Sequence, residues 1–248
     1  MRGYQNMTKR PADQLYSQPL QDIVDFKFDE SVTHVFADMI NRSVPGYANL
    51  ISMIGIIGAE YAQPDSNIYD LGCSLGACSL SLQHHVKEQC TIIAVDNSEP
   101  MIKQLVTRVD PAIQPTISAV CTDLQDMKVE QASVVVLNYT LQFIPLAQRH
   151  HILKHIYDGM QPGAVLILSE KLTNADENQQ QSIETLHHSF KKSQGYSSLE
   201  IAQKRAALEN SLIPETFASH HQRLTTIGFT QVQQWFQCFN FASLMAVK

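Results

Sequence analysis

A glycine-rich turn between residues 66 and 76 constrains this chain more than any other feature. The stretch reads Ser-Asn-Ile-Tyr-Asp-Leu-Gly-Cys-Ser-Leu-Gly and fits two motifs, each of which needs a strand, a tight turn and a helix. In one frame Asp70, Gly72 and Gly76 form the turn that lets a nucleotide-like ligand lie against bare backbone. In the other frame Gly72, Ser74 and Gly76 form the nucleophile elbow of an α/β-hydrolase. The rest of the chain has to decide between them.

Strand-like and helix-like segments alternate along most of the sequence. Two helices are expected first, one from residue 32 with its cap at Asp29 or Ser31, and one over 47–61. Strands are then expected at 67–71, 90–95, 116–121, 132–137 and 164–168, with helices at 77–86, 98–109 and 145–160 and a turn at 161–163. This alternation predicts an α/β fold with a doubly wound, mostly parallel sheet.

The C-terminal part completes the expected sheet. A last helix ends at Gly228, and strands follow at 231–237 and 241–247. No crossover helix fits between them, so they must be antiparallel to each other, and the sheet is expected to have seven strands with an antiparallel strand at the C-terminus.

Length and composition favour a single domain. The 248 residues, 44% hydrophobic and 17% charged, can bury one full core. Residues 1–24 are polar and interrupted by prolines, which predicts a loose start before a domain spanning 25–248. Residues 174–210 form a helix-rich insertion with a break at 191–196, and such insertions usually serve as lids or interfaces.

Charge and hydropathy argue against several functions. A net charge of −6 gives no basic stripe, so we expect no direct nucleic-acid binding. No apolar run is long enough for a signal peptide or a membrane span, which predicts a cytoplasmic protein. The five cysteines and the adjacent histidine pairs lack the spacing of a metal site, so reduced thiols and no metal are expected.

Order along the chain favours the nucleotide frame. Ser74 follows the first strand, whereas a hydrolase elbow follows several strands. Asp96 ends the second strand about twenty residues beyond the glycine turn, where an acid can accept hydrogen bonds from ribose hydroxyls; the alternative is an acid that caps the next helix. Because Ser74 replaces the glycine that admits a pyrophosphate, a ligand without phosphate is expected, namely S-adenosylmethionine rather than NAD.

Polar residues also follow the third and fourth strands. Asp123 can accept a hydrogen bond from the adenine amino group, with Leu124 packing on the ring, and Asn138 ends the fourth strand. Each residue alone is equally consistent with an ordinary turn. Together they predict a cofactor crevice, because the carboxyl ends of parallel strands meet at one edge of the sheet.

Longer segments closely resemble one family, the carboxy-S-adenosylmethionine synthases, which have the fold of class I methyltransferases. The match runs from about residue 25 to the C-terminus and is most specific at Arg42-Ser-Val-Pro-Gly-Tyr47, Gln203-Lys-Arg205 and Leu208-Glu-Asn210, with Leu168-Ser-Glu-Lys171 and the stretch from Trp235 to Phe241 in support. The chain departs from the family pattern at Leu124, at Tyr139 and in the loop 191–194.

The resemblance implies an enzyme that carboxylates rather than methylates. It would use prephenate to carboxylate the methyl group of S-adenosylmethionine and release phenylpyruvate, and a separate enzyme would use the product to modify the wobble uridine of tRNA. A homodimer is also implied. The residues that the resemblance places at the cofactor are Tyr47, Gly72, Cys73, Ser74, Asp96, Asn97, Asp123, Leu124 and Asn138, with Arg205 on the new carboxylate.

Arg205 also has a physical argument of its own. A guanidinium can hold a carboxylate through two parallel charge-assisted hydrogen bonds, a group that an ordinary methyltransferase does not need. On pattern alone, Arg205 beside Lys204 would be a solvated charge on an insertion helix. Two alternatives stay open: a methyltransferase acting on a small molecule or tRNA, and a non-catalytic cofactor-binding scaffold. In the synthase, the insertion 174–210 is expected to close over the site and exclude water.

Overall fold

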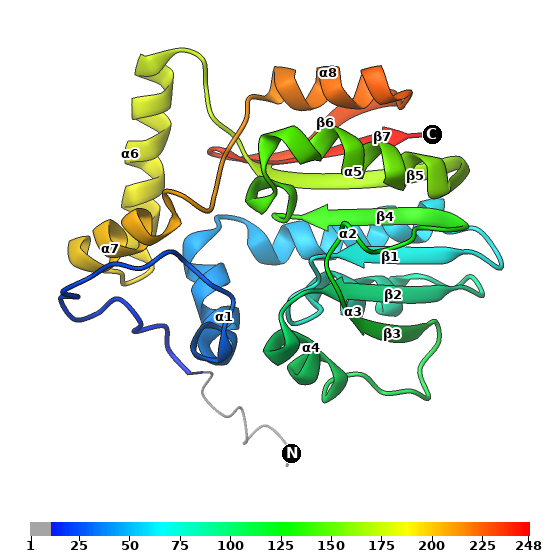
Figure 1. Cartoon of the computed structure of the whole chain (residues 1–248), viewed down its shortest axis with the longest axis horizontal. Coiled ribbons are helices and arrows are strands. Elements are labelled where there is room, and N and C mark those ends of the chain that lie inside the picture. The colour runs from blue at the N-terminus through cyan, green and yellow to red at the C-terminus, as the bar shows by residue number, and fades with distance from the viewer. Residues whose placement is uncertain (1–10) are drawn as a thin grey trace, which may run out of the picture.

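The protein folds around one seven-stranded sheet, which the computed structural model describes within residues 11–248 (Figure 1). The strands are β1 (Asn67–Leu71), β2 (Thr91–Asp96), β3 (Thr116–Cys121), β4 (Ala132–Asn138), β5 (Met160–Lys171), β6 (Thr230–Cys238) and β7 (Phe241–Val247). Their order is β3-β2-β1-β4-β5-β7-β6, with β1 to β5 parallel and β7 antiparallel to both of its neighbours. The predicted doubly wound sheet with an antiparallel C-terminal strand is confirmed.

Helices cover both faces of this sheet. They are α1 (Glu30–Ser43), α2 (Tyr47–Tyr61), α3 (Ala77–His85), α4 (Glu99–Val106), α5 (Leu146–Gly159), α6 (Glu177–Ser193), α7 (Ser198–Leu208) and α8 (Phe217–Ile227), with a short 3₁₀ turn η1 (Leu141–Phe143). The helices α1, α6 and α7 lie beyond the C-terminal ends of the parallel strands rather than on a face (Figure 1). The insertion and the N-terminal helix therefore stand where ligands bind in open α/β sheets.

The core lies on the two faces of the sheet. In β4, Val135 and Leu137 pack with the α5 and α8 side, whereas Val134 and Val136 pack with the α2 and α3 side. All four side chains are fully buried. A strand covered on both faces needs a continuous apolar run, which explains the valine-rich sequence of β4.

Local sequence signals set most boundaries, and two boundaries differ from the expectation. Asp29 caps α1 by accepting from the backbone of Val32, as one of its two candidate caps. The predicted turn 161–163 lies inside β5, because Met160 already pairs with Ala132 of β4 and the strand then bulges. Helix α6 continues to Ser193, so the break in the insertion is shorter than expected.

The N-terminal stretch was expected to be loose up to residue 24, and its first ten residues lie outside the described part of the chain. Residues 11–24 contain no helix or strand. They are nevertheless held to α7, since the Gln203 amide donates to the carbonyls of Tyr16 and Gln18 and accepts from the backbone of Leu20. Asp13 is only 2% exposed. This stretch packs against α1 and α7 (Figure 1).

Between residues 11 and 248, none of the helices has the length and apolar character needed to cross a bilayer.

Candidate functional site

A cavity of about 520 Å³ lies at the C-terminal ends of β1 to β4. Residues at these strand ends form one part of its wall, and α1, α6 and α7 supply another. Strands β2 and β3 are added on one side of β1, and β4 and β5 are added on its other side. The cavity therefore lies at the topological switch point between β1 and β4, where open α/β sheets bind ligands.

The glycine turn after β1 forms the base of the cavity. Gly72 has φ +79°, and a Cβ atom there would lie 2.3 Å from Thr140 Oγ1, so the position requires glycine. Asp70 accepts hydrogen bonds from the backbone (2.9 Å) and hydroxyl (2.5 Å) of Ser79, which holds the first turn of α3 against the turn. Burial raises the pKa of Asp70 to about 6. The two hydrogen bonds thus hold the turn in place from within the chain.

Asp96 bridges the glycine turn and the loop after β2. Its Oδ2 accepts from the backbone of Ser74 at 2.8 Å, and its Oδ1 accepts from the backbone of Ser98 at 2.9 Å. Ser98, rather than Asp96, caps α4. Burial raises the pKa of Asp96, while these two hydrogen bonds oppose the shift. Its remaining lone pairs can accept from ligand hydroxyls at the cavity wall.

Two further acceptors line the same cavity as Asp96. Asp123 accepts a hydrogen bond from the Asn97 amide at 2.7 Å, which fixes both side chains at the cavity wall. Asn138 Oδ1 is buried and has no hydrogen-bond partner among residues 11–248. A buried acceptor without a donor is costly, so a donor from a ligand would relieve it. Carboxylates with an unpaired amide oxygen fit the hydroxyl and amino groups of a nucleoside and would repel a pyrophosphate.

An apolar wall adjoins this polar group. The ring of Phe28 meets the rings of Phe26, Phe36 and Phe143 edge to face, at centroid distances of 5.1, 6.1 and 5.3 Å. All four rings line the cavity. The Phe28 carbonyl accepts from Ser98 Oγ at 2.6 Å, which ties the aromatic wall to the loop that carries Asp96. Flat ligand groups can thus be sandwiched away from water.

Lysine side chains line another part of the same cavity. Lys171 ends β5, Lys191 lies in the last turn of α6, and Lys204 lies on α7. Burial lowers the pKa of Lys191 to about 7 and that of Lys204 to about 8. Sequence reasoning did not place these lysines in the site, although Lys204 is spaced three residues after the buried Ile201 on an inward helix face.

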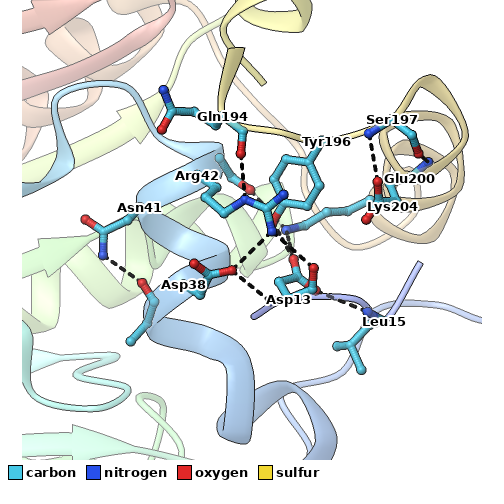
Figure 2. A network of polar contacts seen from close by, with 12 residues as sticks. Asp13, Leu15, Asp38, Asn41, Arg42, Gln194, Tyr196, Ser197, Glu200 and Lys204 are labelled. Atoms are coloured by element: carbon cyan, nitrogen blue, oxygen red, sulfur yellow. Dashed lines mark hydrogen bonds and ion pairs between the residues drawn. The ribbon is translucent and has the colours of Figure 1, made fainter. Parts of the chain in front are cut away.

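A polar network joins α1, the N-terminal segment and the insertion (Figure 2). The guanidinium of Arg42 lies 3.8 Å from the ring centroid of Tyr196 and donates to the carbonyls of Gln194 (2.9 Å) and Asp13 (3.1 Å). Tyr196 in turn donates from its hydroxyl to the Asp13 carboxylate. One arginine of α1 therefore joins the N-terminal segment to the insertion.

The structure brings nine of the ten sequence-predicted residues together. Those that line the cavity are Tyr47, Gly72, Cys73, Ser74, Asp96, Asn97, Asp123, Leu124 and Asn138. Arg205 is not among the lining residues: its side chain is 63% exposed and its Nη2 lies 3.4 Å from Glu184. Burial raises the pKa of the Cys73 thiol, so this residue contributes a neutral surface rather than a thiolate.

Curated proteins resemble the chain over almost its whole length. A carboxy-S-adenosyl-L-methionine synthase of Trichlorobacter lovleyi is 54% identical over 245 residues, covering 98% of this chain and 100% of that protein. Proteins of the same name from Geobacter metallireducens and Vibrio cholerae are 55% and 48% identical, each covering 96% of this chain and 98% of their own length. A family model described as "Methyltransferase domain" matches residues 68–163.

Solved structures with the same fold are more distant in sequence. A putative O-methyltransferase of Nostoc punctiforme superposes with a TM-score of 0.61 at 14% identity, over 88% of this chain and 59% of that one. The magnesium protoporphyrin IX methyltransferase of Synechocystis, solved with bound SAH, gives 0.59 at 15% identity, over 85% and 87% of the two chains. At these identities the likeness shows the fold alone.

Proposed function

Since the chain belongs to the carboxy-S-adenosyl-L-methionine synthases and converts S-adenosyl-L-methionine to its carboxylated derivative, we propose that the carboxyl donor is prephenate, which leaves as phenylpyruvate. One observation carries the proposal. One cavity contains two kinds of lining. Hydrogen-bond acceptors and a glycine turn suit a nucleoside, and a group of lysines suits an anion. A transferase that only methylates needs the first and not the second.

The strand ends would hold S-adenosyl-L-methionine. Asp96 would accept from the ribose hydroxyls and Asp123 from the adenine amino group, with Leu124 against the ring. The unpaired oxygen of Asn138 supports a ligand donor at the fourth strand end. The resemblance to the family implies these residues at the cofactor, and their shared cavity wall supports these roles.

The proposed chemistry balances without a further reactant. The bond between the ring of prephenate and its carboxyl carbon breaks and releases carbon dioxide, and its electron pair aromatises the ring and expels the ring hydroxyl as hydroxide. The hydroxide takes a proton from the methyl group of S-adenosyl-L-methionine, which the adjacent sulfonium acidifies, and leaves as water. The resulting ylide forms the new carbon–carbon bond to the carbon dioxide. The chain has to bring the two ligands together and keep bulk water out.

The insertion is suited to the second task. The cavity at the strand ends is also lined by residues of the insertion, namely His187 and Lys191 of α6 and Lys204 and Leu208 of α7. We propose that the insertion 174–210 acts as a lid that retains the carbon dioxide unit until it reacts. Loosening it should lower the yield of carboxylated product per prephenate consumed, because released carbon dioxide would escape.

Arg205 remains the proposed partner of the new carboxylate. In a single chain its guanidinium pairs with Glu184 outside the cavity lining, so this role requires that α7 move or that the side chain enter the cavity of a second copy. The homodimer that we propose would allow the second route.

The proposal also includes a cytoplasmic location and supply of the product to a separate enzyme that modifies the wobble uridine of tRNA. The net charge of −6 is consistent with a chain that holds no tRNA itself.

Mass spectrometry and a turnover assay test the proposal together. The purified protein should carry, or form when given S-adenosyl-L-methionine and prephenate, a nucleoside heavier than S-adenosyl-L-methionine by one carboxyl group, with equimolar phenylpyruvate. If prephenate is not consumed and only the methyl cofactor or its demethylated product appears, the methyltransferase alternative is correct. If the ligand binds but nothing turns over, the scaffold alternative is correct.

A further inference from the structure

Three lysines that come from separate elements face one part of the cavity. Lys171 is the last residue of β5, Lys191 lies near the end of α6, and Lys204 lies in the middle of α7. All three line the cavity, and Lys191 and Lys204 are only 9% and 6% exposed. Lysine is seldom buried to this degree unless its charge is compensated.

Lys204 has compensation from within the chain. Its Nζ lies 3.7 Å from the carboxylate of Asp13 and donates to Ser43 Oγ at 3.1 Å. Lys171 and Lys191 differ from it. Over residues 11–248 the Nζ atom of neither lysine has a hydrogen bond or an ion pair, and the acid whose charge acts on Lys171, Glu184, is paired with Arg205.

The other groups around these two lysines do not supply the missing negative charge. Burial comes first in lowering the pKa of Lys191 to about 7, followed by the charges of Lys204, Lys171 and Arg205. The pKa of Lys171 is lowered as well, mainly by burial. Burial lowers the pKa of the neighbouring His187 to about 3, so this ring is neutral and donates from Nε2 to the Ser43 carbonyl at 2.8 Å. The lysine pair is thus a cationic cluster without a direct anionic partner among residues 11–248, although the charge of Glu184 opposes the shift at Lys171.

We infer that Lys171 and Lys191 are the binding subsite for the two carboxylates of a dicarboxylate substrate, whereas Lys204 is a structural cation held by Asp13. The inference rests on the proposed function, in which the dicarboxylate substrate is prephenate. Lys191 is buried and Lys171 is partly buried, and two such ammonium groups without a direct partner are expensive to keep. A dianion would neutralise both in a single binding event. Each contact would be a charge-assisted hydrogen bond.

The test compares Lys171→Met and Lys191→Met with a matched control. Methionine keeps the length and apolar stem of lysine and removes the charge. Each variant should raise the KM for prephenate about tenfold or more, which is the usual cost of one charge-assisted hydrogen bond. The dissociation constant for S-adenosyl-L-methionine should stay within about twofold, since the nucleoside contacts lie elsewhere. Lys192→Met, an exposed neighbour, should change neither constant.

Thermal unfolding separates a binding role from a structural one. Replacing a partly or fully desolvated ammonium that has no direct partner should raise the melting temperature of the Lys171→Met and Lys191→Met proteins while their KM rises, because stability and binding are opposed at such a site. Lys204→Met should instead lower the melting temperature, since it leaves the Asp13 carboxylate buried without its cation. If the Lys171 and Lys191 variants melted earlier with unchanged KM, the two lysines would be structural and the inference would be wrong.

The outcomes also separate this inference from the function it rests on. The wild type is assayed first: if it does not consume prephenate, the proposed function fails and the subsite assignment fails with it. If the wild type consumes prephenate and both variants keep its KM, only the subsite assignment is wrong. If the variants weaken S-adenosyl-L-methionine binding instead, the lysines hold the carboxylate of that substrate, and the assignment to prephenate is overturned.

Discussion

The carboxylate of Asp13 lies 3.7 Å from the ammonium nitrogen of Lys204 and accepts a hydrogen bond from the hydroxyl of Tyr196 (Figure 2). The two charged residues are 2% and 6% exposed. Burial lowers the pKa of Lys204, and the charge of Asp13 opposes that shift. An acid from the N-terminal segment thus stabilises a cation in the wall of the candidate-site cavity, so this segment supports the cavity wall.

Replacing Asp13 with Asn should destabilise the protein. The change keeps the shape of the side chain but leaves the Lys204 ammonium buried without an anion, which costs about 2–4 kcal/mol. Urea denaturation of Asp13→Asn should show this loss, whereas Asp22→Asn, at an exposed acid of the same segment, should leave the free energy of unfolding unchanged. The double variant Asp13→Asn/Lys204→Met should be more stable than Asp13→Asn alone, because the orphaned charge is gone. A simple sum of the two single losses would contradict the pairing.

Arg149 should be the most sensitive charged position outside the cavity. Its side chain is fully buried, and its guanidinium donates to Glu215 at 2.6 Å and to the carbonyls of Gln142, Ile144 and Ile213 at 3.1, 2.8 and 2.8 Å. These carbonyls belong to two linkers, residues 141–145 and 210–213, that contribute to the cavity lining. Arg149→Met should therefore lower the free energy of unfolding by about 3–5 kcal/mol.

Two further variants, one conservative and one at a remote arginine, serve as controls for Arg149→Met. Arg149→Lys should recover only part of the loss, since one ammonium cannot reproduce a planar fork that reaches four acceptors. Arg108→Met, at an exposed arginine, should be close to wild type. Full recovery by lysine would mean that charge alone, rather than the geometry of the guanidinium, supports the linkers.

Sequence patterns predicted the fold and the strand-end residues that line one cavity, because both depend on local signals. Strands β1, β3 and β7 are marked by short apolar runs between turn residues, and a polar residue at the end of each parallel strand necessarily reaches the same sheet edge. Asp96 and Asn138 could therefore be placed without a structure.

The lysine side of the site depends on contacts that no local pattern encodes. Asp13 meets Lys204 only because the N-terminal segment packs across α7, and its polar, proline-broken sequence resembles that of a loose tail. The orientation of α7 also decides between neighbours, turning Lys204 into the cavity and Arg205 outward. Adjacent helix residues differ by about 100° in direction, so a motif that contains both residues cannot say which of them faces inward.

His220 should make stability fall in mild acid. Its ring is fully buried on α8, neither nitrogen has a hydrogen-bond partner among residues 11–248, and burial lowers its pKa to about 4. The charges around it are Glu215, Arg149 and Arg223. Because the pKa is about 6.5 in the unfolded chain, the unfolded state binds more protons between pH 6.5 and 4, and the free energy of unfolding must decrease as pH falls through that window.

The His220 contribution can be isolated by its pH slope. Complete titration of one such group corresponds to about 3 kcal/mol, so urea denaturation of the wild type at pH 7.5 and pH 5 should differ by part of that amount. His220→Leu should reduce the difference, while His84→Leu, at an exposed histidine, should not. His187, with a pKa lowered to about 3, contributes in the same direction and will remain in the variant. An unaltered slope in His220→Leu would show that this ring does not titrate on unfolding.

Gly72→Ala should weaken S-adenosyl-L-methionine binding at least about tenfold, through a close approach rather than backbone strain alone. The new Cβ would lie 2.3 Å from Thr140 Oγ1 and 2.4 Å from Thr140 Cγ2. It would force apart the glycine turn and Thr140, the residue before η1, both of which line the cavity.

Gly163→Ala is the matched control, because Gly163 has nearly the same φ as Gly72, +76° against +79°. The atom nearest to its new Cβ is 3.9 Å away, and Gly163 lies outside the cavity lining. This variant should cost only the strain of a left-handed alanine, about 1 kcal/mol of stability, with binding unchanged. Adding Thr140→Ala to Gly72→Ala removes the two shortest contacts and should restore part of the affinity in a calorimetric titration; equal losses in the two glycine variants would show instead that backbone conformation alone sets the requirement.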